Sequence, residues 1–288
     1  MPASTTSGRH SLCVDREIRT PDPWQRWQDI CSDCGLVDMP ASSNFQQAIR
    51  DAQSSALVGP NVVNKALPYV GGGMVLTSVG VLGGMSLLAS GSSLFMPLFW
   101  VALIGNFVLF FVAQNVAMKG NNATALPLLS VYSLTTGFTL SGLVSYAIAV
   151  VGAANPANPY AGVSAVGTAA LATGITFVIA SIVGRRMSDS VGQALSGAVG
   201  LGLIGLIIAM VVQLVGGLFT GGTFGGAGFE LMIAGFGTVL FVGAAFVDFY
   251  TMPRAYRDEQ YLAGALSMYL TYINLFIFIL RLIIVLNG

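Results

Sequence analysis

Charged side chains are scarce in this sequence, and long stretches of it contain none. They make up 8% of the 288 residues, against about 25% in soluble globular proteins. Hydrophobic residues make up 55%, and the mean hydropathy is +0.77. The formal net charge is zero, so no basic surface for nucleic acid is expected. The composition excludes an ordinary soluble domain and indicates an integral membrane protein, with the lipid bilayer as its partner.

Cysteine and histidine are absent from the apolar part of the chain. All three cysteines and the single histidine lie within the first 34 residues. This excludes disulfides, haem ligation and His/Cys metal sites from the apolar part, where we expect no cofactor. The spacing His10-x-x-Cys13 followed by Cys31-x-x-Cys34 does resemble a zinc site. Because no alternation typical of strands lies between the two halves, a zinc site is the less favoured interpretation.

The first part of the chain is polar, in contrast to the apolar remainder. Residues 1–41 contain no apolar run long enough for a signal peptide, and we expect them to be disordered. Met1-Pro-Ala-Ser recurs as Met39-Pro-Ala-Ser, directly before the composition changes, so Met39 is a candidate for the true start. Residues 42–66 then show a helical period, which predicts an amphipathic helix on the cytoplasmic membrane surface.

The remaining residues, 67–288, contain apolar stretches of the length that crosses a bilayer. A helix needs about 20 apolar residues to span the hydrocarbon core. Glycines scattered through these stretches allow helices to approach closely, so Gly200-x-Gly-x-x-Gly205 is interpreted as a packing surface rather than a dinucleotide site. The sequence predicts an all-α membrane protein with seven spans, at about 68–90, 95–117, 124–153, 162–183, 194–219, 230–251 and 264–286.

Basic residues occur in every second connection between these spans. The other three loops contain no lysine or arginine. This alternation places the amino terminus and the basic loops in the cytoplasm, and an odd number of spans then places the C-terminus outside. The residues concerned are Arg50, Lys65, Lys119, Arg185, Arg186, Arg254 and Arg257.

Asp248 is a carboxylate near the end of a predicted span, with Val247 before it and Phe249 after it. A charge within a bilayer costs several kcal/mol, so such a residue is by default functional. We interpret Asp248 as a carboxylate that responds to protons and cations at the cytoplasmic mouth of a pathway. The alternative is a structural carboxylate that reaches cytoplasmic water or pairs with Arg254 or Arg257.

Helix geometry gives the depth of Asp248 and of its expected neighbours. At 1.5 Å per residue, Asp248 lies about 5 Å from the cytoplasmic end of its span. Arg281 of the last span lies about 15 Å deeper, so we expect it to reach the outer interface rather than pair with Asp248. The residues of the last span that share the depth of Asp248 are Thr271, Tyr269, Tyr272 and Asn274.

The spans offer no set of residues typical of an enzyme. They contain serines but no histidine or lysine base, which argues against a serine protease. A hydrolytic metal site needs several carboxylates or histidines, and the spans supply only Asp248, with Glu230 at a span boundary. No lysine follows Lys119, which excludes the Schiff base of a retinal protein. We therefore expect that the protein is not an enzyme.

Three segments resemble the Bax inhibitor-1 family, the transmembrane Bax inhibitor motif proteins. Val131-Tyr-Ser-Leu-Thr-Thr-Gly-Phe-Thr-Leu-Ser141 is similar to its third-span motif. Two further segments are similar to the last two spans of the family. They are Phe241-Val-Gly-Ala-Ala-Phe-Val-Asp-Phe-Tyr250 and Ala265-Leu-Ser-Met-Tyr-Leu-Thr-Tyr-Ile-Asn-Leu-Phe276, the second followed by Leu280-Arg-Leu. A fourth segment, Asn44-Phe-Gln-Gln-Ala-Ile-Arg50, resembles bacterial members of this family, of the cyanobacterial type.

The resemblance implies a seven-helix bundle with the last helix central and a pH-sensitive calcium leak. In this family two aspartates share protons and gate a pore from the cytoplasmic side; Asp248 matches the first, but Thr271 stands where the second is usual. Coupled carboxylates titrate in two steps, whereas one carboxylate beside a hydroxyl binds one proton. We therefore expect a shallower pH dependence. Bacterial relatives can carry a basic partner on the second span, which here has none before Lys119.

The leading hypothesis is thus a passive leak channel for calcium or another cation, regulated by protons. We expect it in a bacterial cytoplasmic membrane, or alternatively in a thylakoid membrane. The second is a non-conducting membrane regulator or scaffold, whose partner is another membrane protein such as a quality-control protease. A proton-coupled transporter is less favoured, because the sequence shows no convincing repeat.

Overall fold

The computed structural model describes residues 57–220 and 225–287. In these residues it contains seven helices that are long and apolar enough to cross a membrane, and no strand, which confirms the predicted fold class. They are α3 (Val62–Ala89), α4 (Phe95–Met118), α5 (Asn122–Ala154), α6 (Ala161–Val183), α7 (Asp189–Thr220), α8 (Gly226–Ala255) and α9 (Tyr261–Asn287), with short 3-10 turns η1 (Gly184–Arg186) and η2 (Asp258–Gln260).

Several helices extend beyond the predicted spans. α3 begins at Val62, where the sequence predicts the end of a surface helix, and its first residues are buried in the bundle. α8 continues to Ala255, and Pro253 lies in its last turn. These ends carry polar residues, which lower the local hydropathy while the helix continues. Several predictions concern residues that the structure does not describe. They are the zinc-like spacing of His10, Cys13, Cys31 and Cys34, the disorder of residues 1–41 with the candidate start Met39, and most of the surface helix at 42–66.

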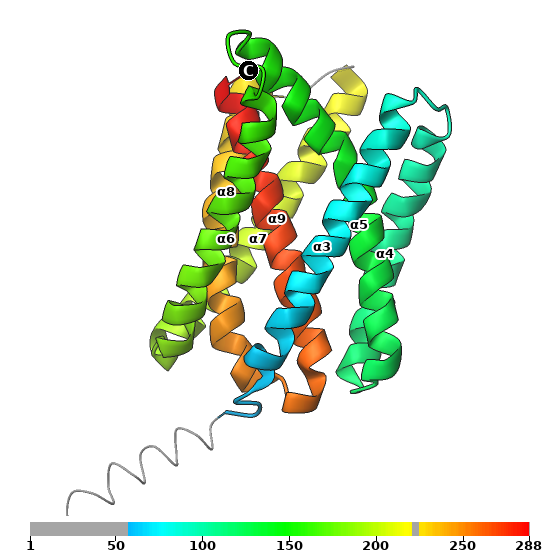
Figure 1. Cartoon of the computed structure of the whole chain (residues 1–288). Coiled ribbons are helices and arrows are strands. Elements are labelled where there is room, and N and C mark those ends of the chain that lie inside the picture. The colour runs from blue at the N-terminus through cyan, green and yellow to red at the C-terminus, as the bar shows by residue number, and fades with distance from the viewer. Residues whose placement is uncertain (1–56, 221–224, 288) are drawn as a thin grey trace, which may run out of the picture. The chain divides into compact units, whose positions relative to one another are not determined.

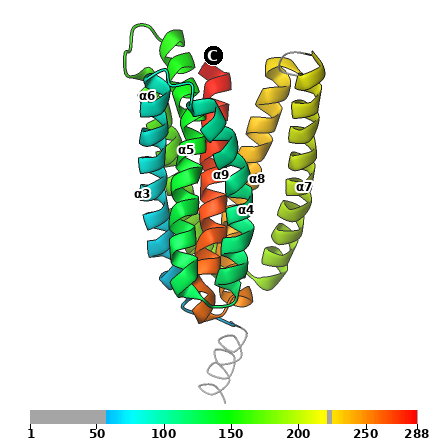
Figure 2. The ribbon, with the colours of Figure 1, turned by 90° about the vertical axis from the view of Figure 1, so that its right-hand side faces the viewer.

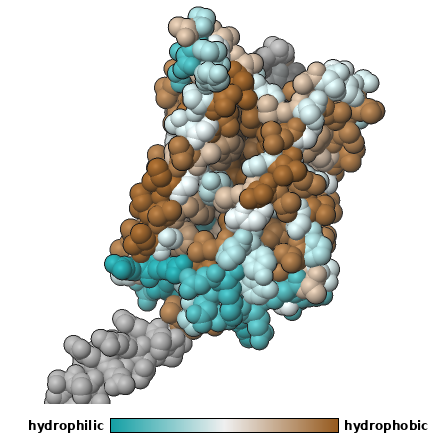
Figure 3. All heavy atoms as spheres, viewed as in Figure 1, coloured by the Kyte–Doolittle hydropathy of each residue, from teal (hydrophilic) through white to brown (hydrophobic). Residues whose placement is uncertain are grey.

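α9 lies in the middle of the bundle, as the family resemblance implied (Figure 1). It contacts α3, α4, α5, α6 and α8, and Tyr269, Leu275 and Leu280 on it have no exposed surface. α7 has the opposite position: it packs mainly on α8, and Figure 2 shows these two helices together at one side. Apolar side chains cover much of the flank that Figure 3 shows, as expected for a surface that faces lipid.

The contact between α3 and α5 brings the two backbones together. A Cβ atom on Gly137 would lie 2.0 Å from the carbonyl oxygen of Thr77, and one on Gly80 would lie 2.2 Å from that of Leu134. Apolar side chains gain little by leaving lipid, so helices in a membrane associate through this kind of close packing. The glycines are therefore required at these two positions by the space available.

At one end of the bundle, which we call the basic end, α3, α5, α7 and α9 begin. Lys65, Arg185 and Arg254 all bond to other residues there, and hydrophilic side chains gather at this end in Figure 3. The C-terminus lies at the other end, which we call the opposite end (Figure 1).

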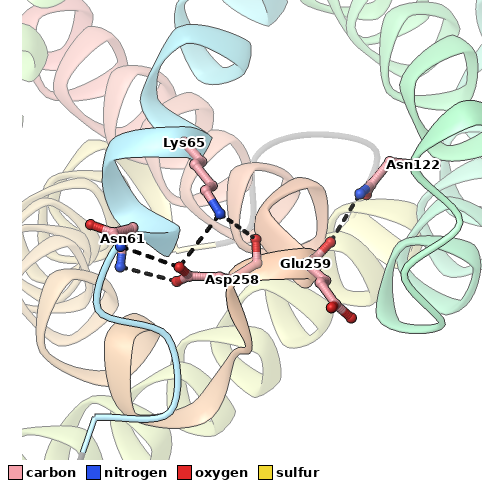
Figure 4. A network of polar contacts seen from close by, with 5 residues as sticks. All are labelled: Asn61, Lys65, Asn122, Asp258 and Glu259. Atoms are coloured by element: carbon pink, nitrogen blue, oxygen red, sulfur yellow. Dashed lines mark hydrogen bonds and ion pairs between the residues drawn. The ribbon is translucent and has the colours of Figure 1, made fainter.

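Polar contacts at the basic end fix the turn between α8 and α9 (Figure 4). Asp258 accepts a hydrogen bond from the backbone N–H of Asn61 at 3.0 Å and lies 3.4 Å from Lys65 Nζ. The negative charge of Asp258 thus lies at the start of α3, where the helix dipole favours it. Asn122 at the start of α5 donates to the carbonyl oxygen of Glu259 at 3.0 Å. These contacts hold the pair of helices that carries the candidate site.

We predict that Gly137→Ala destabilises the protein by about 1–3 kcal/mol, because its methyl group would overlap the α3 backbone. Gly142→Ala on the same helix is the matched control, since its Cβ would meet nothing within 4 Å. Thermal unfolding of both variants in detergent measures the difference. Equal melting temperatures would contradict the described α3–α5 contact.

Candidate functional site

Asp248 and Thr271 face each other across the contact between α8 and α9. The two helices are joined by the short turn at η2, so they run antiparallel as neighbours. Asp248 lies two helical turns before the end of α8, and Thr271 lies at a similar height on α9. The Thr271 side chain is buried, and its hydroxyl is close enough to interact with the carboxylate.

The Asp248 carboxylate has few partners. Its Oδ1 accepts a long hydrogen bond of 3.5 Å from the hydroxyl of Ser267 on α9. Its Oδ2 is buried and has no hydrogen-bond partner among the described residues. Arg254 turns away and pairs with Asp189 at 3.1 Å, and no basic side chain in the described part of the chain pairs with Asp248. A buried carboxylate without compensation is unfavourable.

Three side chains beside this carboxylate or beside its neighbours were not identified from the sequence. Ser267 precedes Thr271 by one helical turn, so its spacing on the same face could have indicated it. Tyr256 lies just beyond the end of α8, near the side chains of Gln114 and Ser267. Burial and then the Asp248 carboxylate raise the pKa of the Tyr256 phenol above its ordinary value, so it remains a hydrogen-bond donor. Gln114 on α4 has a buried Oε1 without a partner among the residues described.

The other residues predicted to share this layer point elsewhere. Tyr269 faces α3 and α5: its hydroxyl lies 2.5 Å from that of Thr77, and its ring lies 5.7 Å from that of Tyr132. The ring of Tyr272 packs on Phe177 of α6, with the centroids 5.1 Å apart. Asn274 donates to a carbonyl oxygen of its own helix. Depth along a helix does not fix direction, and of the four predicted residues only Thr271 lies beside Asp248.

Arg281, predicted as a basic residue near the outer interface, has an acidic partner within the bundle. Its Nη2 lies 2.6 Å from Oε1 of Glu230 at the beginning of α8. Glu230 and Asp248 are 18 positions apart on that helix, about 27 Å. Arg281 is therefore remote from Asp248 and belongs to a separate polar cluster.

A comparison with protein families identifies the chain. The family model described as "Inhibitor of apoptosis-promoting Bax1" matches residues 59–288, which include all seven described helices and the Asp248 site. The chain belongs to the Bax inhibitor-1 family. The three segments that resemble this family in sequence thus lie within one match that covers most of the chain.

Relatives of this member of the Bax inhibitor-1 family include bacterial proteins, some of which are named as membrane proteins. An uncharacterized membrane protein of Streptococcus pyogenes serotype M1 is 30% identical over 194 residues, which cover 64% of this chain and 73% of the relative. The uncharacterized protein YrjE of Lactococcus lactis is 28% identical over 214 residues, covering 72% and 80%. Bax inhibitor 1 of Schizosaccharomyces pombe is 39% identical over 54 residues, which cover only 19% of this chain and 20% of the relative. The seven apolar helices, the family match and the name of the Streptococcus relative together support a multi-pass membrane protein.

Among the described residues, the polar site of this family member contains a single carboxylate. Thr271 stands where the family resemblance implies a second aspartate, and Gln114 of α4 lies beside Tyr256. The arrangement can bind one proton at Asp248, or a cation that supplies the missing positive charge. A hydroxyl at 271 can accept or donate a hydrogen bond in either state.

We predict that Asp248→Asn raises the melting temperature in detergent at pH 8 with a calcium chelator. Removing a charged oxygen that has no partner relieves an unfavourable free energy of about 1–3 kcal/mol. Asp258→Asn is the control at a paired carboxylate and should lower the melting temperature slightly, because it removes the contacts to Asn61 and Lys65. A clear loss of stability in Asp248→Asn would mean that the carboxylate has a strong partner.

Proposed function

We propose that this protein is a passive leak channel for calcium or another cation, and that Asp248 is its pH sensor and gate. The observation that supports this is the buried carboxylate oxygen without a partner, at the contact between α8 and the central helix. The family's implied activity points the same way. In this proposal the basic end faces the cytoplasm, because positively charged loops are retained on that side.

The gate depends on the charge of one residue. When Asp248 is ionised, no nearby side chain compensates it, so a cation that enters from the basic end supplies the favourable interaction. When Asp248 is protonated, its O–H can donate to Thr271 or Ser267, and the α8–α9 contact closes without a buried charge. Tyr256, just beyond the end of α8, lies near Ser267 and Gln114 and interacts with the Asp248 carboxylate.

The proposal is tested by calcium flux into proteoliposomes at several pH values. The wild type should conduct with a pH dependence, and in Asp248→Asn that dependence should disappear because the amide cannot titrate. Glu259→Gln is the matched control, since its exposed carboxylate points away from the contacts in Figure 4, and it should behave as the wild type. Empty vesicles give the background.

Each other outcome identifies an alternative. No protein-dependent flux at any pH would contradict the channel and favour a non-conducting regulator or scaffold, for which the single carboxylate at this site is an additional argument. Calcium accumulation against its gradient, driven by a proton gradient, would instead indicate a proton-coupled transporter.

We further predict that Thr271→Asp makes the pH dependence of flux steeper, approaching two protons in place of one. The new carboxylate would lie beside Asp248 and titrate with it as a coupled pair. Thr271→Ser retains a hydroxyl and should keep the one-proton profile. An unchanged profile in Thr271→Asp would contradict the role given to residue 271.

A further inference from the structure

A second polar cluster, formed by Arg281, Glu230 and Gln213, lies near the opposite end of the bundle. Arg281 Nη2 and Nε donate to Oε1 of Glu230 at 2.6 Å and 2.9 Å. Gln213 donates from Nε2 to Oε2 of Glu230 at 2.5 Å, and its Oε1 lies 3.5 Å from Arg281 Nη2. The three side chains come from α9, α8 and α7. The cluster is neutral overall, but it presents one positive and one negative group side by side.

The cluster lines a cavity of about 610 Å³ between the α7–α8 pair and helices α5 and α9. The cavity exists because α7 packs mainly on α8. Its volume is in the range of sites that hold small molecules. Apart from the cluster and Tyr146, the walls are mostly apolar, with Leu143, Leu214 and Ile284 among them. Leu214 is 66% exposed, so this wall opens toward the surface that lipid covers.

The depth of the cluster matches the boundary between headgroups and acyl chains. Glu230 lies about 6 Å from the start of α8, and Arg281 lies about 9 Å from the end of α9. Helices of 27 and 30 residues are about 40–45 Å long, which equals a bilayer including its headgroups. Both charged groups therefore lie where the polar part of a phospholipid meets its chains.

We propose that this cavity binds a zwitterionic phospholipid of the adjacent leaflet. The lipid ammonium group pairs with Glu230, the phosphate pairs with Arg281, and an acyl chain lies along Leu143, Leu214 and Ile284. A simple anion or cation would have to compete with an existing ion pair and would leave one charge without a partner. A zwitterion would replace the ion pair between Arg281 and Glu230 with two charge-assisted contacts, one to each side chain. Its charge pattern is therefore complementary to that of the cluster.

The test is lipid retention by the purified full-length protein, measured by native mass spectrometry. Phosphatidylethanolamine, phosphatidylcholine and phosphatidylglycerol with identical chains are added in turn to delipidated protein. The wild type should retain the two zwitterionic lipids about tenfold better than the anionic one, the ratio that one charge-assisted contact supplies. Equal retention, or a preference for the anionic lipid, would overturn the proposal.

Variants separate binding from folding. Glu230→Gln should reverse the preference toward the anionic lipid, because Arg281 then lacks a negative partner; an unchanged preference would contradict the site. Should that variant not fold, the double exchange Glu230→Arg with Arg281→Glu keeps the ion pair and should keep the zwitterion preference. Glu259→Gln, far along the chain from the cluster and exposed, is the control and should match the wild type.

A last arm distinguishes lipid from a soluble ligand of the same charge pattern. Glycerophosphoethanolamine, the headgroup without chains, should displace bound lipid only weakly, because the apolar wall contributes nothing to its binding. Displacement by the free headgroup at the same concentration as by intact lipid would overturn the assignment to lipid.

Discussion

The structure depends on one constraint: within the bilayer no water is available, so polar groups must find partners inside the protein. Most of the hydroxyls in the spans meet this need on their own helix. Thr77 donates to the carbonyl oxygen of Gly73 at 2.8 Å, and Thr173 donates to that of Ala169 at 2.7 Å. These side chains add no charge and leave the helices free to pack through small residues. Against this background, the few charged groups that remain are the informative ones.

Two charged positions meet the constraint in different ways. Arg281 and Glu230 compensate each other across α9 and α8, and Gln213 completes their hydrogen bonds. Among the residues that the structure describes, Asp248 has the distant hydroxyl of Ser267 and the nearby Thr271 as hydrogen-bonding neighbours. The first is a neutral pair that suits a ligand with both charges, and the second is a single charge that suits a proton or a cation. About 27 Å of α8 separates them, so each can be tested without disturbing the other.

The central position of α9 connects these features. It carries Ser267 and Thr271 on one face, Tyr269 on another and Arg281 near its end, so it takes part in both polar sites and in the core. The turn that precedes it is fixed by Asp258 and Glu259 to the starts of α3 and α5 (Figure 4). A movement of α9 relative to α8 would change the surroundings of Asp248, because Ser267 and Thr271 on α9 lie beside that carboxylate.

The sequence by itself determined the seven spans, the family, the gathering of basic residues at alternate loops and the position of one carboxylate, Asp248, within a span. These depend on local quantities: hydropathy, the rise of a helix, and the rarity of charge in lipid. Only the tertiary structure decided that Thr271 faces Asp248 while Tyr269 faces α3, that Arg281 meets Glu230, and that Gly137 touches the backbone of Thr77. Each of these depends on how far a helix is rotated about its own axis. That rotation is set by the packing of several neighbouring helices together, which no single stretch of sequence contains.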